Sequence, residues 1–273
     1  MPRCAEPSCG RWRPSPRLAL SFLSRRRLNG EWYCSERCVE SAALTSLDAP
    51  QAPARSATSL PPTRIGVLLR TLGAVREEQV QEALALQKNT GLTLGAQLRA
   101  LGYVDRDVLL RALASQAAVA YLRSFDLRRV CGGSPLPVAT VRALGLVPFE
   151  FDAATERIHV LCAAPVPRVA LRALARLTEW TPVPYLVHDE VWAEALEAYE
   201  PLPEARHEAV AVSDLNAAAA HVAHATAQGD VTMRHVEYDR YIWVRVEAPQ
   251  RVSDVLVTPH MMEAPCPAVH TAL

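Results

Sequence analysis

A segment in the middle of this 273-residue chain repeats with a period of 29 residues, and this duplication constrains the fold more than any other feature. The first copy spans residues 64–87 and the second spans residues 93–116, with five residues between them. Ten of the 24 aligned positions are identical. Because a solenoid generally needs at least about three repeats, two copies predict one compact helical unit with approximate two-fold symmetry.

Each copy has the pattern of a short helix, a glycine-centred turn and a longer helix. Leu69 and Leu72 lie three residues apart on one face of the first helix, and Gly73 can adopt the positive φ that ends it. Asp105 is the expected N-cap of the last helix, whereas Arg76 occupies that place in the first copy. In each long helix a spacing of four and three places three residues on one stripe, namely Val80, Leu84 and Gln87 or Leu109, Leu113 and Gln116.

These motifs resemble the N-terminal domain of bacterial type II secretion and type IV pilus assembly ATPases. The first copy reads Arg64-Ile65-Gly66-x-x-Leu69-x-x-x-Gly73, and the second reads Leu94-Gly95-x-x-Leu98-x-x-x-Gly102. In the MshE-like branch of that family, tandem 24-residue motifs bind cyclic di-GMP. The segments that follow are similar to the family's second, α/β half, so the resemblance covers about residues 64–200.

The resemblance implies a cyclic di-GMP site that uses both copies. The expected contacts are Arg64, Ile65, Gly66, Leu69, Gly73, Val80, Leu84 and Gln87 of the first copy, and Thr93, Leu94, Gly95, Leu98, Gly102, Leu109, Leu113 and Gln116 of the second. The glycines would open the helix starts to phosphate, Arg64 would stack on a guanine or bind it through two parallel hydrogen bonds, and the leucines would form an apolar floor. Thr93 departs from the pattern, because it stands where the first copy has arginine.

The hypothesis favoured by these motifs is a cyclic di-GMP-binding effector or adaptor without a motor domain. It would couple the second messenger to a partner protein of a secretion, pilus or signalling system. Leucines at helical spacing are also typical of an ordinary core, so a nucleotide-independent interaction scaffold of such a system is the alternative.

Four of the seven cysteines lie in the first 38 residues. Four residues separate Cys4 from Cys9, three separate Cys34 from Cys38, and 24 lie between the two pairs. Two close pairs are typical of a tetrahedral zinc site, and no histidine precedes His159, so a metal here would have cysteine ligands only. The segment resembles a treble-clef zinc knuckle. Free cysteines or two disulfides are the other interpretations, although disulfides are rare in a reducing compartment.

Charge gives little support to a nucleic-acid partner. Basic and acidic residues both total 29, so no overall field attracts nucleic acid or anionic membrane. Residues 1–30 contain seven arginines and one glutamate, a local charge of +6, which leaves a zinc-dependent nucleic-acid binder as a further alternative. No recognition helix can be singled out there, so we expect a solvated loop.

No catalytic signature is present, and we expect no enzymatic activity. The single lysine, Lys88, lies outside any Gly-x-x-x-x-Gly-Lys-Ser/Thr loop, which excludes a P-loop ATPase. Cys131 and Cys162 are expected to be buried structural thiols. The apolar stretch Leu18–Leu23 is far too short to span a bilayer, so we expect a cytoplasmic protein without membrane insertion.

Shifts in composition predict a multidomain α/β (α+β) protein in which a helical tandem-repeat subdomain packs with a small α/β subdomain. The expected parts are a Cys4 zinc knuckle (1–44), a linker (45–63), the tandem-motif subdomain (64–117), the α/β subdomain (118–200), a linker (201–209), a module of one helix and a β-hairpin (210–258) and a tail (259–273).

Overall fold

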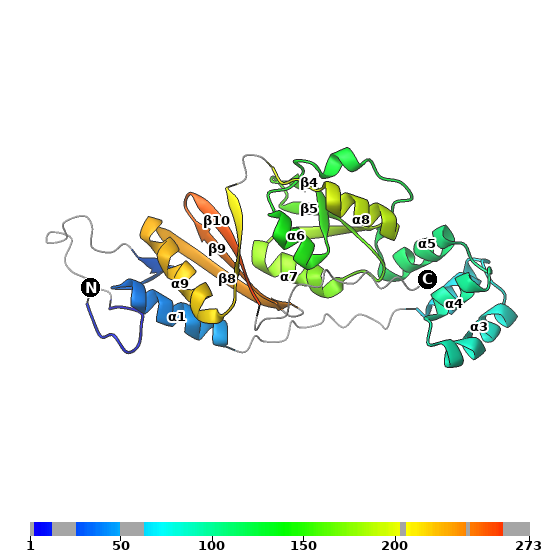
Figure 1. Cartoon of the computed structure of the whole chain (residues 1–273), viewed down its shortest axis with the longest axis horizontal. Coiled ribbons are helices and arrows are strands. Elements are labelled where there is room, and N and C mark those ends of the chain that lie inside the picture. The colour runs from blue at the N-terminus through cyan, green and yellow to red at the C-terminus, as the bar shows by residue number, and fades with distance from the viewer. Residues whose placement is uncertain (1–2, 13–25, 50–62, 203–205, 239–240, 259–273) are drawn as a thin grey trace.

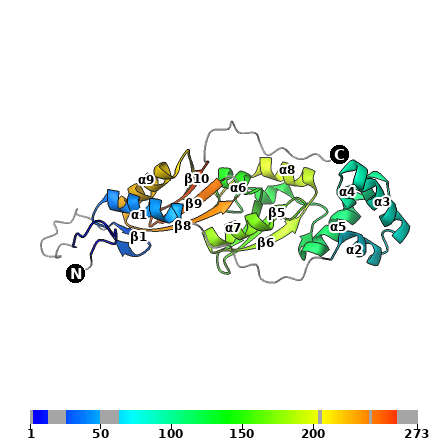
Figure 2. The ribbon, with the colours of Figure 1, turned by 90° about the horizontal axis from the view of Figure 1, so that it is seen from below.

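The computed structural model describes most of the chain, namely residues 3–12, 26–49, 63–202, 206–238 and 241–258. Most of the expected linker 45–63 and the whole expected tail 259–273 lie outside the described residues, as do three arginines of the basic N-terminal segment. Figures 1 and 2 show a four-helix unit at one end, an α/β unit in the middle and a second sheet at the other end. The expected fold class is confirmed.

The elements have the following bounds. The helices are α1 (Glu36–Asp48), α2 (Ile65–Thr71), α3 (Glu77–Thr90), α4 (Leu94–Ala100), α5 (Arg106–Ala117), α6 (Val138–Leu144), α7 (Arg168–Thr178), α8 (Asp189–Ala198) and α9 (Leu215–Ala225). The strands are β1 (Arg27–Leu28), β2 (Glu31–Trp32), β3 (Ala120–Tyr121), β4 (Val147–Asp152), β5 (Arg157–Cys162), β6 (Thr181–Leu186), β7 (His207–Val212), β8 (Asp230–Tyr238), β9 (Tyr241–Ala248) and β10 (Arg251–Val257). None of the helices in the described ranges is long and apolar enough to cross a membrane.

Helices α2 to α5 form the helical unit that the repeat predicts. Gly73 and Gly102 have φ values of +69° and +71° and end the two short helices, as expected. Asp105 caps α5 by accepting a hydrogen bond from a backbone amide of the first turn at 2.7 Å. In the first copy the Gln79 side chain instead accepts a hydrogen bond from the amide of Arg76 at 2.8 Å. The two copies therefore reach the same local structure through different caps.

The middle unit is built on a four-stranded sheet in the order β3-β6-β5-β4. β4 is antiparallel to β5, and the other neighbours are parallel. Ile158 of β5 and Leu174 of α7 are fully buried in the core between sheet and helices. Cys162 is buried in β5 as expected. The expectation that Cys131 is buried is wrong, because this residue follows a short 3-10 helix at the surface and is exposed.

The outer sheet joins two segments that are far apart in the sequence. Its strand order is β2-β1-β8-β9-β10-β7. The expected hairpin is present as the antiparallel pair of β8 and β9, whereas β7 and β10 were not predicted. β1 runs parallel to β8, with Arg27 opposite Asp230, and α1 lies against α9 on one face of the sheet (Figure 1). The expected knuckle and the expected C-terminal module therefore share one apolar core, which includes Val39, Ala43, Leu47, Ala218 and Val222.

The other face of the outer sheet packs on the middle unit. Val236, Trp243 and Leu256 belong to the same apolar core as α7. The sheet thus lies between α1 and α9 on one side and the middle unit on the other.

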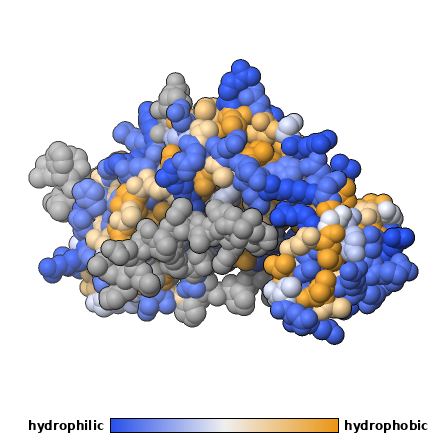
Figure 3. Space-filling model, turned by 45° about the vertical axis from the view of Figure 1, so that its right-hand side comes forward, coloured by the Kyte–Doolittle hydropathy of each residue, from blue (hydrophilic) through white to orange (hydrophobic). Residues whose placement is uncertain are grey.

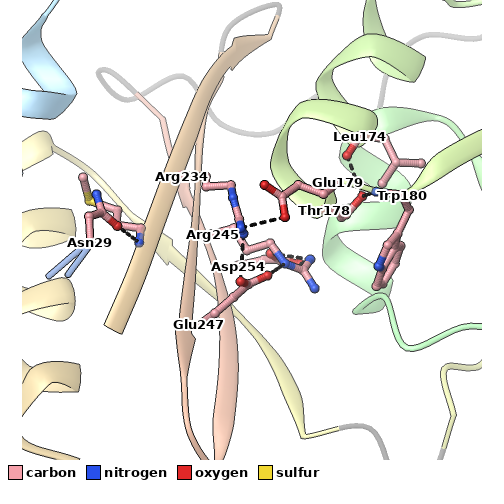
Figure 4. Close-up of polar contacts among 10 residues, drawn as sticks. Asn29, Leu174, Thr178, Glu179, Trp180, Arg234, Arg245, Glu247 and Asp254 are labelled. Atoms are coloured by element: carbon pink, nitrogen blue, oxygen red, sulfur yellow. Dashed lines mark hydrogen bonds and ion pairs between the residues drawn. The ribbon is translucent and has the colours of Figure 1, made fainter. Parts of the chain in front are cut away.

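Charged residues of the outer sheet also face the middle unit (Figure 4). Arg245 and Asp254 are only 2% and 1% exposed, and their side chains lie 3.2 Å apart. The guanidinium of Arg245 lies 5.2 Å from the centre of a Trp180 ring. Arg234 pairs with Glu179, the C-cap of α7, at 2.9 Å. Ionic and aromatic contacts therefore join the two units in addition to their shared apolar core.

Candidate functional site

The starts of α2 and α4 lie side by side at one end of the helical unit. A Cβ built on Gly66 would lie 3.1 Å from Leu94 Cδ2 and 3.2 Å from Val80 Cγ1. At Gly95 it would lie 2.9 Å from Leu109 Cδ1. Glycine at position 66 therefore allows α2 and α4 to approach each other, and glycine at position 95 allows α4 to lie close to Leu109 of α5. On that side the glycines serve helix packing, and neighbouring side chains fill the room where the sequence analysis expected a ligand.

Each short helix packs on the long helix of the other copy. α2 lies against α5, and α4 lies against α3. The end of α5 reaches the chain just before α2, where Gln116 Nε2 donates a hydrogen bond to the carbonyl oxygen of Thr63 at 2.5 Å. The sequence predicts one half-site per copy, whereas in the structure each short helix lies against the long helix of the other copy while its glycine approaches Val80 or Leu109 of its own copy.

Four of the predicted ligand contacts form the core of the helical unit. Leu69 and Leu98 are 0% exposed, and Val80 and Leu109 are 6% and 9% exposed. These side chains pack against one another and against the rest of the four helices. They cannot form a floor for a ligand while the helices remain packed in this way.

The other predicted contacts reach the surface to different degrees. Arg64 and Thr93 are exposed, and Leu84 is 37% exposed. Val67 and Leu72 add exposed apolar surface, and Figure 3 shows apolar areas over this unit. The partly buried members are Ile65, Gln87, Leu94, Leu113 and Gln116. A ligand face on this unit would therefore combine leucine side chains with amides and one arginine.

The two helix starts are not equivalent in chemistry. Thr93 caps α4, because its Oγ1 accepts a hydrogen bond from the amide of Ala96 at 3.4 Å. Arg64 precedes α2 and makes no such bond, so its guanidinium is available at the surface. Gly73 and Gly102 lie at the far ends of the seven-residue short helices, about 10 Å from the starts, where they form the turns.

A pocket of about 150 Å³ lies where the end of α5 meets the middle unit. Its lining residues are Leu113, Gln116, Ala117, Ala164, Pro165, Val166, Arg168 and Leu186. Arg168 closes one side, and its Nη2 donates a hydrogen bond to the carbonyl oxygen of Ala117 at 3.0 Å. Sequence reasoning missed this pocket, because it exists only once two subdomains have packed together.

A polar cluster, also missed from the sequence, fastens α5 to the middle unit. Asp107 Oδ1 lies 2.7 Å from His188 Nε2 and accepts a hydrogen bond from the Tyr121 hydroxyl at 2.9 Å. Arg123 pairs with the second carboxylate oxygen at 2.7 Å. The hydrogen bond from Tyr121 is the main reason why the pKa of Asp107 lies below its usual value, and burial raises the pKa of Tyr121 to about 12. These contacts join α5 to the middle unit.

Four cysteine sulfur atoms meet at the edge of the outer unit. The Sγ atoms of Cys4, Cys9, Cys34 and Cys38 all lie within 4.8 Å of one another. Cys9 Sγ is 3.3 Å and Cys38 Sγ is 3.7 Å from Cys34 Sγ, which is too long for a disulfide bond of about 2.0 Å. Tetrahedral ligands at about 2.3 Å from zinc would be roughly 3.8 Å apart. The spacing of the sulfur atoms therefore fits a zinc ion.

Local structure explains how the chain gathers these sulfurs. Ser35 caps α1 and accepts a hydrogen bond from the amide of Cys38 at 3.4 Å, which places Cys38 in the first turn of the helix. The amide of Cys34 points at Cys4 Sγ over 3.4 Å. A backbone hydrogen bond from Arg11 is the largest cause that lowers the pKa of Cys9 to about 7, whereas burial raises that of Cys34 to about 12. A bound cation would favour the thiolate at every position.

Several solved structures resemble part of this chain, while no family model and no curated protein matches it. MshE with cdg is 26% identical, with a TM-score of 0.43, and the match covers 50% of this chain and 99% of that one. Two crystal forms of the N-terminal domain of XpsE are 18% and 19% identical, with TM-scores of 0.35 and 0.30. They cover 54% and 55% of this chain and 99% and 100% of their own. The resemblance predicted from the tandem motifs is confirmed as a structural similarity over about half of the chain.

Proposed function

We propose that this chain is a cyclic di-GMP-binding effector or adaptor that couples the second messenger to a partner protein. The observation that carries the proposal is the packing of two equivalent helix starts, so close that a Cβ on Gly66 would lie 3.1 Å from Leu94. Each start belongs to one copy of a duplicated sequence, so the duplication relates the two helix starts, although Arg64 and Thr93 differ in chemistry. Cyclic di-GMP is itself two-fold symmetric, with two guanines and two phosphodiesters in one ring.

The accessible residues of this face have the chemistry that such a ligand needs. Arg64 can stack on one guanine or donate two hydrogen bonds to its O6 and N7 edge. Leu84 is 37% exposed and Leu94 and Leu113 are partly buried, and the accessible parts of these side chains can pack against the bases and riboses. The Gln116 amide is fixed by its bond to the backbone and keeps hydrogen-bonding capacity for the ligand.

Calorimetric titration of the full chain with cyclic di-GMP tests this proposal. Arg64→Ala is expected to weaken binding by about 10- to 100-fold, because a charge-assisted hydrogen bond contributes about 1.5–3 kcal/mol. Arg99→Ala is the matched control, since Arg99 is also exposed but lies near the far end of α4. Absence of binding at protein and ligand concentrations of about tens of micromolar rejects the proposal.

One observation favours the alternative of a nucleotide-independent scaffold. Leu69, Val80, Leu98 and Leu109 are used as an ordinary helical core. If the scaffold hypothesis is correct, capture of the partner from a bacterial secretion, pilus or signalling system is independent of added cyclic di-GMP. If the effector hypothesis is correct, the dinucleotide changes partner affinity and Arg64→Ala abolishes that change.

We also propose that the four-cysteine cluster binds a structural zinc ion. Elemental analysis of the purified protein should find about one equivalent of zinc, and Cys38→Ser should lower that content. Cys131→Ser is the matched control, because Cys131 is a free, exposed cysteine outside the cluster. Less than half an equivalent in the unsubstituted protein counts against the proposal.

In this role the protein acts in the cytoplasm, catalyses no reaction and has no nucleic-acid partner. Incubation with cyclic di-GMP should therefore leave the dinucleotide intact, as chromatography can measure. Conversion of the dinucleotide to linear products by the purified chain, but not by Arg64→Ala, would contradict the proposal.

A further inference from the structure

The outer face of α7 carries three arginines in a row. Arg168, Arg172 and Arg176 are spaced by four residues, so they share one face of the helix, about 6 Å apart. All three are exposed. Leu174 and Leu177 on the opposite face are fully buried in the core of the middle unit. We call these three residues the arginine stripe.

The arginine stripe is not neutralised within the described part of the chain. Arg172 and Arg176 make no ion pair with a described acidic residue, and Arg168 donates only to a backbone carbonyl. The acidic residue at the end of the helix, Glu179, pairs with Arg234 instead. Burial is the largest cause that lowers the pKa of His235, and the positive charge of Arg176 is the second.

Folding does not require the stripe. Like charges four residues apart on a helix repel each other at a cost of about 0.2–0.5 kcal/mol per pair. The stability of α7 comes from its buried face, and among the three arginines only Arg168 contributes a hydrogen bond to the rest of the described fold, through the carbonyl oxygen of Ala117. Val169, which is 54% exposed beside the stripe, likewise contributes little to the core. Arginine is enriched at protein–protein interfaces, so a row of guanidinium groups without ion-pair partners is typical of a docking site.

We propose that the arginine stripe docks an acidic helical segment of a partner protein. Guanidinium groups bind carboxylates through two parallel hydrogen bonds, and carboxylates spaced by four residues on a helix would match the stripe in length. The stripe extends only about 12 Å and ends at Glu179, which is 67% exposed, so it suits a short segment. A duplex or an anionic bilayer presents negative charge over a much broader area, and this chain has no net charge to attract either one.

The position of the stripe connects it with the proposed cyclic di-GMP face. Arg168 begins α7 and lines the same pocket as Gln116 at the end of α5. The docking proposal rests on the proposed function in one respect: it specifies the chemistry of the partner protein that the proposed function requires. A ligand bound at the helix starts would lie next to one end of the arginine stripe.

Fluorescence anisotropy with the full chain tests the docking proposal. The probe is an alanine-based helical peptide of about 16 residues with glutamate at every fourth position, and its control has the same composition with the glutamates placed around the helix. The combined variant Arg168→Ala, Arg172→Ala and Arg176→Ala should bind the probe about tenfold more weakly, as expected for the loss of three exposed ion pairs. The matched variant, with the same change of charge, replaces Arg99, Arg111 and Arg142 by alanine and should bind normally.

Equal losses in the two triple variants, or equal affinity for the two peptides, would overturn the proposal. Tighter binding of a single-stranded DNA oligonucleotide, or of vesicles with phosphatidylserine, to the unsubstituted chain would also overturn it and assign the stripe to those partners. Arg64→Ala should still bind the probe. A chain that binds the probe but not cyclic di-GMP would therefore refute the proposed ligand and leave the docking site in place.

Discussion

At the scale of single residues, Gly66 and Gly95 occupy equivalent positions in the two copies but differ in how closely the neighbouring side chains approach them. A Cβ on Gly66 would lie 3.2 Å from Val80 Cγ1, and a Cβ on Gly95 would lie 2.9 Å from Leu109 Cδ1, the equivalent residue of the second copy. The longer side chain in the second copy takes up the space that a Cβ would need. Replacement of Gly95 should therefore cost more than replacement of Gly66.

We predict that Gly95→Ala lowers the free energy of unfolding by about 1–3 kcal/mol, because a methyl group is forced against Leu109 Cδ1. Helix propensity alone predicts the opposite sign, a gain of about 0.5–1 kcal/mol. Urea denaturation of the full chain measures the change in the free energy of unfolding and shows whether the packing argument or helix propensity gives the correct sign. Addition of Leu109→Val, which copies the first repeat, should recover part of the loss, and a Gly95→Ala protein as stable as the parent would contradict the packing argument.

Because of His207 in β7, we expect the folding stability of the protein to depend on pH between about 4 and 6.5. Burial, reinforced by the charge of Arg245, lowers the pKa of His207 from 6.5 to about 4. Between these values the unfolded chain binds a proton that the folded chain does not, so stability is full above pH 6.5 and falls as the pH drops toward 4. His207→Gln should flatten this decline between about pH 7 and pH 5, measured by urea midpoints. Parallel profiles for the two proteins would argue against the assignment.

At the scale of elements, local signals were predicted well and pairings between distant elements were not. The turn glycines, the Asp105 cap and the β8–β9 hairpin depend on neighbouring residues, so the sequence shows them directly. β1 has only two residues and pairs with a strand some 200 positions away, and nothing in its composition indicates that partner. The packing of α1 on α9 depends on small residues that also suit many other neighbours.

The candidate ligand face was predictable in part for a similar reason. The spacing of Leu84, Gln87, Leu113 and Gln116 indicates a stripe on a helix, but not which short helix lies beside it. The exchange of partners between the two copies is a property of tertiary packing, as is the burial of Leu69. The cysteine cluster was easier to predict from the sequence, because two closely spaced pairs of cysteines limit the ways in which the four sulfur atoms can be arranged.

Because Cys38 lies in the first turn of α1, we predict that metal loss loosens this helix and its neighbour α9. Hydrogen exchange with and without a strong chelator should show faster exchange in residues 36–48 and 215–225 after chelation. Residues 77–90 of α3, in the distant helical unit, provide an internal control and should be unchanged. Uniform acceleration along the chain, or none in α1, would contradict the expected effect.

At the scale of the whole molecule, the outer sheet and the middle unit are joined by a polar contact inside an apolar interface. Asp254 accepts a hydrogen bond from Thr140 of α6 at 3.3 Å and pairs with Arg245. Burial raises the pKa of Asp254, and the charge of Arg245 opposes that rise. The carboxylate and the guanidinium therefore depend on each other, and each is costly to bury alone.

We predict that Asp254→Ala destabilises the protein by about 1.5–3 kcal/mol, because it removes a buried charge-assisted contact of Arg245 and leaves Glu247, 3.1 Å away, as the acidic partner of that guanidinium. Arg128→Ala, which breaks an exposed pair with Asp126 and keeps the backbone cap that Asp126 accepts, should cost less than about 1 kcal/mol. Denaturant unfolding of both variants provides the comparison. Asp254→Leu combined with Arg245→Met should recover much of the loss, and similar small effects at both sites would refute the prediction.

The parallel pairing of β1 with β8 has a consequence for biosynthesis. Arg27 leaves the ribosome 203 residues before its partner Asp230. At about 5–20 residues per second, the N-terminal segment waits some 10–40 s for the strand that completes its sheet. During that interval the apolar face of α1 cannot pack against α9, which has not yet been synthesised. Binding of a chaperone, or early binding of a metal ion to the cysteines, would therefore protect the nascent chain.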